Sequence, residues 1–388
     1  MKALEVSLLI LGIVNHIPYS VAQSQQTLAQ DALSDILGRG APILGSDTGC
    51  GQDSPTCDWM AKVPDETQIV HMNLPGTHDA ATWNYSQATQ DSLIRYTGSD
   101  IPPAEVFRCQ EHSLFDMLNG GIRVFDLRYS WNPGNDTVGF YHGAALLAPT
   151  TRIEDVFFGF YSWLDAHPTE AILVSMNYEG GPGRQNTAEL QEHIYNLFES
   201  PLAKRYWMQT NGRLGTLGES RGKLILLQRF AYSLLPTELT NRIGIALPPD
   251  LWTDNGPNIE LVYNEDEDRI AYIEDFYEPH PPTKESPDNR AEINILWKFN
   301  ATIAHLERAG DSSNETTKDQ LFITFASAEN NDENVFPKIM ALGNGTSTTG
   351  VNQRLLEWLG EKRGQRRGVV MLDFFDTVPG LVEAVIDL

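Results

Sequence analysis

The sequence predicts an α/β protein, a distorted (β/α)8 or TIM barrel that forms a single domain behind an N-terminal extension. Two observations predict this fold. Short runs of β-branched and apolar residues recur eight times along the 388-residue chain, and helical patterns fill several of the intervals between them. Nearly continuous apolar strands separated by helices are typical of a parallel sheet covered on both faces, and eight such strands favour a closed barrel.

The expected elements follow from these patterns in chain order. The apolar runs predict strands at residues 68–74, 121–127, 138–141, 171–176, 223–227, 270–273, 321–326 and 368–372. The helical patterns predict helices at residues 114–118, 152–166, 188–198, 288–308 and 351–361. The interval 128–137 is too short for a full helix, so we expect the barrel to be distorted there, with a loop at 131–134.

The N-terminal end predicts export. Residues 1–22 carry Lys2, an apolar run at 8–14 and a small-residue ending, which is typical of a secretory signal peptide. The run is too short to span a bilayer, and no other segment approaches the roughly 18 apolar residues that a membrane helix needs. We therefore expect a soluble, secreted chain with a signal peptide at 1–22, an extension at 23–60 containing a short helix at 28–37, and the barrel domain at 61–388.

Two further patterns fit an extracellular protein. Five Asn-x-Ser/Thr acceptors for glycans are present, of which chance accounts for roughly one or two, at Asn84, Asn135, Asn300, Asn314 and Asn344. Cys50 and Cys57 lie in a polar loop where a small disulfide ring could form outside the cell. Cys109 is left over, and we expect a buried, unreactive thiol.

The charge of the chain limits its partners. A formal net charge of -24 argues against binding to nucleic acid and leaves no polybasic patch for anionic lipid. The acidic tract at 264–268 lacks the alternating ligands and the central glycine of a calcium loop, so we expect a solvated loop or helix start. We expect a monomer.

Polar residues stand at the ends of the predicted strands, where barrel enzymes place their active sites. His78 and Asp79 follow the first strand, Asp126 and Arg128 end the second, and His142 ends the third. Asn177, Arg229, Asp275 and Asp373 end later strands. Each residue alone has a structural explanation, and their shared level in the barrel carries the argument. Two imidazoles and a guanidinium can supply the base, the acid and the phosphate-binding cation of phosphodiester cleavage.

Three segments carry a resemblance to a known family: Leu74-Pro75-Gly76-Thr77-His78-Asp79, Val124-Phe125-Asp126-Leu127-Arg128 and Phe140-Tyr141-His142-Gly143. Together they resemble the catalytic X-domain of the secreted phosphatidylinositol-specific phospholipases C, in the metal-independent, bacterial-type branch. Residues 221–230, 274–277 and 369–374 are similar to later strands of that family. The resemblance covers roughly 69–388, and the N-terminal region with its two cysteines is most similar to fungal secreted members.

The resemblance implies a role for each catalytic residue. His78 would be the general base for the inositol 2-hydroxyl, oriented by Asp373, and His142 the general acid for the diacylglycerol oxygen, held charged by Asp79. Arg128 would bind the phosphoryl oxygens where calcium-dependent relatives place a metal-ligating carboxylate, so no cofactor and no catalytic metal are expected. The products would be diacylglycerol and a cyclic inositol phosphate.

The resemblance extends less evenly to the substrate pocket. Arg229, Asp275 and Tyr277 match residues that bind the inositol, and Asp126 would support them. Asn177 replaces the lysine usual in bacterial members, which leaves the headgroup open. A related diesterase acting on glycerophosphodiesters or sphingolipid headgroups, and a non-catalytic secreted binding barrel, are the alternatives.

The aromatic pair beside the His-Asp turn raises the question of membrane contact. Trp83 and Tyr85 would either insert among lipid headgroups during a transient contact with a membrane or pack over the first helix. Asn84 between them is a glycan acceptor, and a glycan there would hinder flat docking. If Asn84 is glycosylated, we therefore expect a soluble or protruding substrate, such as a glycosyl-phosphatidylinositol anchor or a water-soluble inositol phosphodiester.

Overall fold

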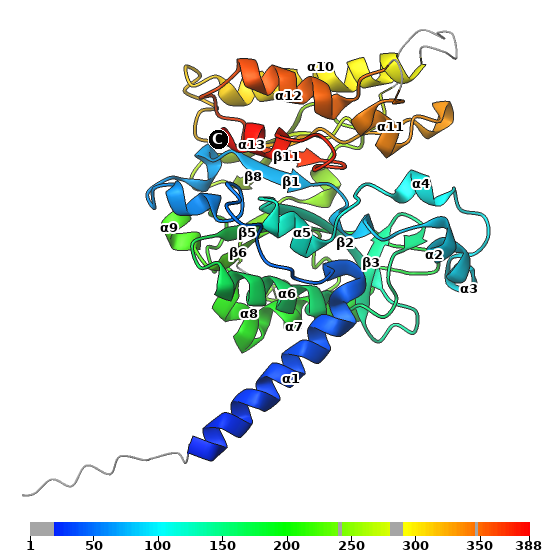
Figure 1. Cartoon of the computed structure of the whole chain (residues 1–388), viewed down its shortest axis with the longest axis vertical. Coiled ribbons are helices and arrows are strands. Elements are labelled where there is room, and N and C mark those ends of the chain that lie inside the picture. Colours follow the sequence, from blue (N-terminus) through cyan, green and yellow to red (C-terminus); the bar gives the residue numbers. More distant parts are fainter. Residues whose placement is uncertain (1–18, 240–242, 280–289, 346–347) are drawn as a thin grey trace, which may run out of the picture.

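The computed structural model describes residues 19–239, 243–279, 290–345 and 348–388. Its sheet curves into a nearly closed barrel with helices around it (Figure 1). Most of the predicted signal peptide lies outside the described residues. In the part of the chain that is described, no helix has both the length and the apolar character to cross a membrane.

Eight strands of the described sheet run parallel, as the sequence predicts for a barrel. In chain order they are β1 (Leu74–Thr77), β2 (Val124–Trp131), β5 (Ala171–Tyr178), β6 (Lys223–Arg229), β7 (Ile245–Ala246), β9 (Arg269–Glu274), β10 (Leu321–Phe325) and β11 (Val369–Leu372). Their spatial order is β7-β6-β5-β2-β1-β11-β10-β9, and β8 (Ile259–Asn264) adds to β9 antiparallel. The barrel fold is confirmed, with an antiparallel strand at its seam.

The first predicted strand is wrong in its position. Residues Ile69–His71 form the short helix η2, and the strand begins only at Leu74. Ile69 donates its backbone N–H to the carbonyl of Gly215, and its side chain packs with Val70 and the inward-facing strand residues. The run is therefore apolar because it closes the amino end of the barrel, which requires burial but no strand pairing.

The third predicted strand is a strand but not part of the parallel barrel. β3 (Val138–His142) pairs antiparallel with β2 and with β4 (Ala145–Leu146), so a hairpin replaces the helix that should follow β2. This is the distortion that the short interval 128–137 predicts. β7 takes the place of β3 among the parallel strands, and its two residues pair with Leu227 and Gln228.

All five predicted helices of the barrel domain are present, although the predicted start of one at residue 288 lies outside the described residues. The helices after the extension are α2 (Gln87–Ser92), α3 (Ile94–Thr97), α4 (Ala104–Phe107), α5 (Leu114–Asn119), α6 (Ile153–Ala166), α7 (Ala188–Glu199), α8 (Pro201–Tyr206), α9 (Leu217–Ser220), α10 (Arg290–Gly310), α11 (Pro337–Leu342), α12 (Val351–Glu361) and α13 (Leu381–Ile386). Their apolar faces form one core with the outward-facing strand residues, and the inward-facing residues form a second.

The N-terminal extension is a long helix joined to the barrel at one end. α1 (Tyr19–Leu44) is longer than the predicted helix at 28–37 and projects away from the barrel (Figure 1). Its last turns pack on α6, where Arg39 pairs with Asp155 at 2.5 Å. Gly159 permits this approach, because a Cβ there would lie 2.5 Å from Leu44 Cδ2.

The loop that follows α1 contains the predicted disulfide. Cys50 and Cys57 are paired, with their Cα atoms 5.9 Å apart. The acidic tract at 264–268 forms the turn between β8 and β9 and is largely exposed, in agreement with the predicted solvated loop.

Candidate active site

A cavity of about 560 Å³ opens at the carboxyl ends of the parallel strands. Most of the predicted site residues line it: His78, Arg128, His142, Asn177, Arg229, Asp275, Tyr277 and Asp373. Asp79 and Asp126 lie beneath them, buried to 2% and 0% exposure. The structure thus brings together side chains that are as much as 295 residues apart in the chain.

The turn after β1 presents two neighbouring side chains to the same cluster. The backbone N–H of His78 donates to the Leu372 carbonyl at 3.1 Å. Gln110 Nε2 donates to the backbone carbonyls of His78 and Leu372, each at 2.8 Å. Asp79 has the left-handed backbone conformation (φ 40°, ψ 51°). Successive side chains of an extended strand point to opposite faces, so this turn is what lets His78 and Asp79 act together.

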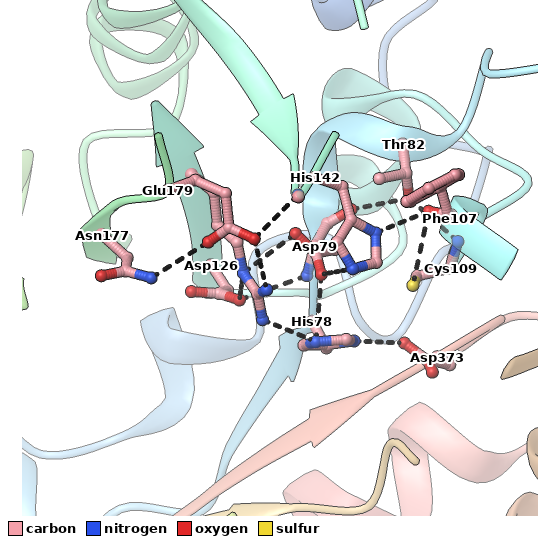
Figure 2. Close-up of polar contacts among 12 residues, drawn as sticks. His78, Asp79, Thr82, Phe107, Cys109, Asp126, His142, Asn177, Glu179 and Asp373 are labelled. Carbon is pink, nitrogen blue, oxygen red and sulfur yellow. Dashed lines mark hydrogen bonds and ion pairs between the residues drawn. The ribbon is translucent and has the colours of Figure 1, made fainter. Parts of the chain in front are cut away.

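His78 lies between two carboxylates and a guanidinium (Figure 2). Its Nδ1 is 2.9 Å from Asp373 Oδ1, and its Nε2 is 2.8 Å from Arg128 Nη2 and 3.1 Å from Asp79 Oδ2. Burial favours the neutral imidazole, but Asp373 and Asp79 outweigh it and raise the pKa of His78 to about 9. The contact with Arg128 suits the neutral ring, since Nε2 must then accept a hydrogen bond, whereas the charged ring would donate to Asp79.

Asp79 joins the two histidines. Its Oδ2 lies 3.2 Å from His142 Nε2, and its Oδ1 lies 3.0 Å from Arg128 Nε. His142 Nδ1 is 2.8 Å from the carbonyl oxygen of Phe107, so Nδ1 carries a hydrogen and Nε2 is the atom free to exchange a proton. The arrangement holds His142 ready to carry a second proton, which Asp79 would stabilise.

Arg128 contacts three carboxylates. Its partners besides Asp79 are Asp126 at 3.2 Å and Glu179 at 3.2 Å. Burial opposes the charged guanidinium, but these carboxylates raise the pKa of Arg128 well above its ordinary value. Burial likewise raises the pKa of Asp126, yet Arg128 and Arg229 outweigh it and lower that pKa to about 2. Arg128 therefore stays charged beside an ionised Asp126.

Glu179 is a site residue that the sequence analysis missed. Its Oε1 accepts hydrogen bonds from Arg128 Nη1 at 3.2 Å and from the Gly143 N–H at 2.9 Å, and its Oε2 accepts one from Asn177 at 3.2 Å. Burial raises the pKa of Glu179, but Arg128 and His142 outweigh it and lower that pKa. The sequence could have indicated Glu179, because it stands two residues beyond Asn177 and side chains two residues apart lie on the same side of an extended chain.

The other wall of the cavity contains the predicted headgroup residues and two that were missed. The Arg229 guanidinium lies 3.8 Å from the ring centre of Trp252, whose indole N–H donates to Asp275 at 2.7 Å. The Tyr277 hydroxyl donates to Asp254 at 2.6 Å. Trp252 and Asp254 come from the loop between β7 and β8, where no strand pattern marked them.

The aromatic pair after the His-Asp turn packs inward. The Trp83 indole N–H donates to the carbonyl of Ile43 at 2.8 Å, and Tyr85 is only 2% exposed. The packing alternative agrees with the structure: Tyr85 is buried, and Trp83 is partly buried against the end of α1. Asn84 between them is exposed.

Cys109 is buried, as predicted, and burial together with Asp373 and Asp79 raises the pKa of its thiol well above the ordinary value. The sequence did not indicate its surroundings. Its sulfur lies within 4.8 Å of ligand atoms of both His78 and His142. A further group of potential metal ligands, around Cys50 and Cys57, offers no thiolate because the two cysteines form the disulfide.

Comparisons with known proteins agree with this geometry. No family model matches the chain. It is 26% identical over 215 residues to a protein of Listeria monocytogenes named 1-phosphatidylinositol phosphodiesterase, covering 54% of this chain and 62% of that protein. It is 24% identical over 204 residues to a protein of the same name from Staphylococcus aureus, covering 51% and 57%. The chain thus spans less than two thirds of the length of these relatives.

Solved structures extend the likeness to most of the fold. A structure of the phosphatidylinositol-specific phospholipase C of S. aureus matches with a TM-score of 0.64 at 20% identity, covering 86% of this chain and 98% of that one. The phospholipase of L. monocytogenes matches with a TM-score of 0.57 at 21% identity, covering 85% and 97%. The structures show a shared barrel fold. The sequence matches support the assignment of the chain to the phosphatidylinositol-specific phospholipase C-like family.

Proposed function

We propose that this protein is a phosphodiesterase that cleaves phosphatidylinositol-type substrates into diacylglycerol and a cyclic inositol phosphate. One observation carries the proposal: two imidazoles and a guanidinium meet around the buried carboxylate of Asp79, at the edge of the barrel where the cavity opens. The names of the bacterial relatives support the substrate class.

The first half of the reaction requires a base. Neutral His78 takes the proton of the inositol 2-hydroxyl on Nε2, while its Nδ1–H donates to Asp373. The hydroxyl oxygen then bonds to phosphorus. Because Asp373 and Asp79 raise the pKa of His78 to about 9, the charged ring predominates at pH 7 before substrate binds. The carboxylates that align His78 therefore also limit its basic form.

The second half requires an acid and a cation. As the bond from phosphorus to the diacylglycerol oxygen breaks, His142 gives its Nε2 proton to the departing alkoxide. Arg128 exchanges carboxylate partners for the non-bridging phosphate oxygens and stabilises their charge. Each proton and bond in this scheme is accounted for by side chains of this chain.

The headgroup is recognised on the opposite wall in this proposal. Arg229, Asp275 and Tyr277 line the cavity, where hydrogen bonds to sugar hydroxyls can form. Asn177 supplies no positive charge there, and its amide already donates to Glu179. This neutral position favours the second candidate function, cleavage of a related diester such as a glycerophosphodiester.

A secreted location remains part of the proposal. The Cys50–Cys57 disulfide supports an oxidising compartment, and the asparagines of all five glycan acceptors are exposed, which supports a glycoprotein. The predicted signal peptide, the likeness to fungal members and the monomeric state stay predictions. The mass of the secreted chain after enzymatic deglycosylation tests whether the signal peptide is removed, and the difference from the mass before the treatment tests whether glycans are attached.

The exposed Asn84 also bears on the form of the substrate. A glycan beside the His-Asp turn would hinder flat docking on a membrane, so we propose a soluble or protruding substrate. Enzymatic deglycosylation should then raise activity on phosphatidylinositol vesicles more than on a water-soluble inositol phosphodiester. Equal activity on vesicles before and after the treatment would rule out this role for the glycan.

Phosphorus NMR tests the proposed reaction. The purified protein is mixed with phosphatidylinositol in micelles with excess chelator, beside the His78→Ala and His142→Ala variants. A cyclic inositol phosphate signal should appear with the wild type alone. His112→Ala is the matched control, since His112 is an exposed histidine paired with Asp376 outside the cavity. A wild-type protein that is folded yet inactive on every inositol lipid would refute the proposal.

A further inference from the structure

Cys109 is held at the floor of the cavity by main-chain hydrogen bonds from both sides. Its N–H donates to Thr82 Oγ1 at 3.0 Å, and its carbonyl accepts from the N–H of Phe374 at 2.9 Å. The first contact ties it to the turn after β1 and the second to the end of β11. The proposed reaction assigns this thiol no task, although it borders the cavity together with both catalytic histidines.

The atoms around the sulfur are those that bind a borderline-soft metal ion. The Cys109 sulfur, a nitrogen of His142 and an oxygen of Asp79 all lie within 4.8 Å of one another. Figure 2 shows the sulfur between Phe107 and Asp373, close to the two imidazoles. A tetrahedral zinc site has ligand distances of about 2.0–2.3 Å, so its ligand atoms lie about 3.3–3.8 Å apart. Side-chain movements of about 1 Å would therefore complete such a site.

A cation would compete with protons for the ligand atoms of this group. His142 donates from Nδ1 to the Phe107 carbonyl, which leaves Nε2 as its ligand atom. Asp79 Oδ2 is buried between the two imidazole Nε2 atoms, with which it forms ion pairs at 3.1 and 3.2 Å. A metal ion that displaces a proton from these nitrogens would find the carboxylate oxygen beside it.

The charge around the thiol also favours a cation. Four carboxylates, Asp79, Asp126, Glu179 and Asp373, surround the catalytic cluster against the guanidinium groups of Arg128 and Arg229 and the charged imidazole of His78. A sulfur, nitrogen and oxygen donor set suits Zn²⁺ or Cd²⁺, whereas Ca²⁺ and Mg²⁺ require a shell of oxygen atoms.

We propose that Cys109, His142 and Asp79 form an inhibitory site for a thiophilic divalent cation of the zinc class. The cation bonds to the sulfur as the thiol proton leaves to solvent, and it occupies His142 Nε2, the atom that must protonate the leaving group. Inhibition rests on the proposed function, whereas binding of the cation does not.

Cobalt binding tests the site without any turnover. Co²⁺ bound to a thiolate gives a charge-transfer band in the near ultraviolet, which water or histidine ligands alone do not give. The band should appear with the wild type and with His112→Ala, the exposed-histidine control, and be absent from Cys109→Ala. No band with the wild type, or a band that persists in folded Cys109→Ala, would overturn the proposal. Cys109→Ser replaces the alanine variant if that one does not fold.

Inhibition then connects the site to activity. Buffered free Zn²⁺ should inhibit the wild type, a chelator should restore it, and Mg²⁺ and Ca²⁺ should have no effect. Cys109→Ala should keep its turnover and raise the inhibition constant about 100-fold or more, because losing even an outer-shell partner lowers metal affinity about 10- to 100-fold. Equal inhibition of both proteins would overturn the proposal. A protein that binds Co²⁺ through Cys109 but cleaves no inositol lipid would leave the site standing and refute the proposed function.

Discussion

Arg123 and Arg128 lie five residues apart, at opposite ends of the barrel, and their surroundings differ in kind. Arg123 is completely buried just before β2 and donates to Glu170 at 2.7 Å and to three backbone carbonyls. Arg128 is 16% exposed, borders the cavity and faces three carboxylates. The first arginine meets fixed acceptors that no ligand can replace, whereas the second meets side chains that a phosphate can replace.

The difference shows that buried charge has different roles at the two ends of the barrel. At the amino end, burial is the largest influence on Arg123 and lowers its pKa, so the ion pair with Glu170 must be complete to be tolerated. At the carboxyl end, an excess of carboxylate keeps Arg128 charged and open to exchange. Stability should therefore depend on the first arginine and catalysis on the second.

Removal of Arg123 should give the largest effect. Arg123→Ala leaves Glu170 buried without its partner, which costs about 3–5 kcal/mol of unfolding free energy. Chemical denaturation measures it. The double variant Arg123→Met, Glu170→Met removes both charges and should recover most of the loss. A single variant as stable as the wild type would contradict the assigned structural role.

Replacement of Arg128 should leave the fold intact and impair the reaction. Arg128→Lys keeps the charge among the three carboxylates but loses the forked donor geometry, so kcat/KM should fall about 100- to 1000-fold. The thermal midpoint should stay at the wild-type value. If stability fell as in Arg123→Ala while kcat/KM did not, the comparison of the two ends would fail.

Glu179 should have a smaller effect, as a positioning residue that acts through Arg128 and the Gly143 N–H. Glu179→Gln keeps an acceptor oxygen but removes the charge, so kcat should fall about tenfold, and Glu179→Ala should lose about 100-fold. Steady-state kinetics on one substrate separate kcat from KM. Equal rates for Glu179→Ala and the wild type would show that Arg128 needs no third carboxylate.

Local patterns revealed much of this protein from sequence. The turn that presents His78 and Asp79, the strand predicted at 368–372 and the helix predicted at 351–361 each depend on neighbouring residues, and each is present in the structure, although the turn follows Thr77 and not Leu74. The predicted cluster around Asp79 could be anticipated because strand ends of a barrel converge on one edge.

Features that depend on long-range contacts could not be predicted. β7 is only two residues long, too short for a periodic pattern, and it forms because Leu227 pairs with Ile245. The run at 68–74 is apolar because it is buried, and strands are apolar for the same reason. Its sequence therefore could not distinguish a strand from a segment that closes the amino end of the barrel. Cys109 approaches the catalytic histidines through a hydrogen bond with Phe374, more than 260 residues away.

The proton affinity of His78 is the finest test of the difference between the two ends. The charge of Asp373 favours the imidazolium, so Asp373→Asn, which keeps an acceptor for Nδ1–H, should lower the pKa of His78 from about 9 by about one unit or more. NMR titration of the histidine ring signals measures it. Asp376→Asn is the matched control, because Asp376 pairs with exposed His112 and should leave His78 unchanged. An unchanged pKa in Asp373→Asn would mean that Asp79 alone holds the proton, and the base would then depend on the same carboxylate that charges the acid.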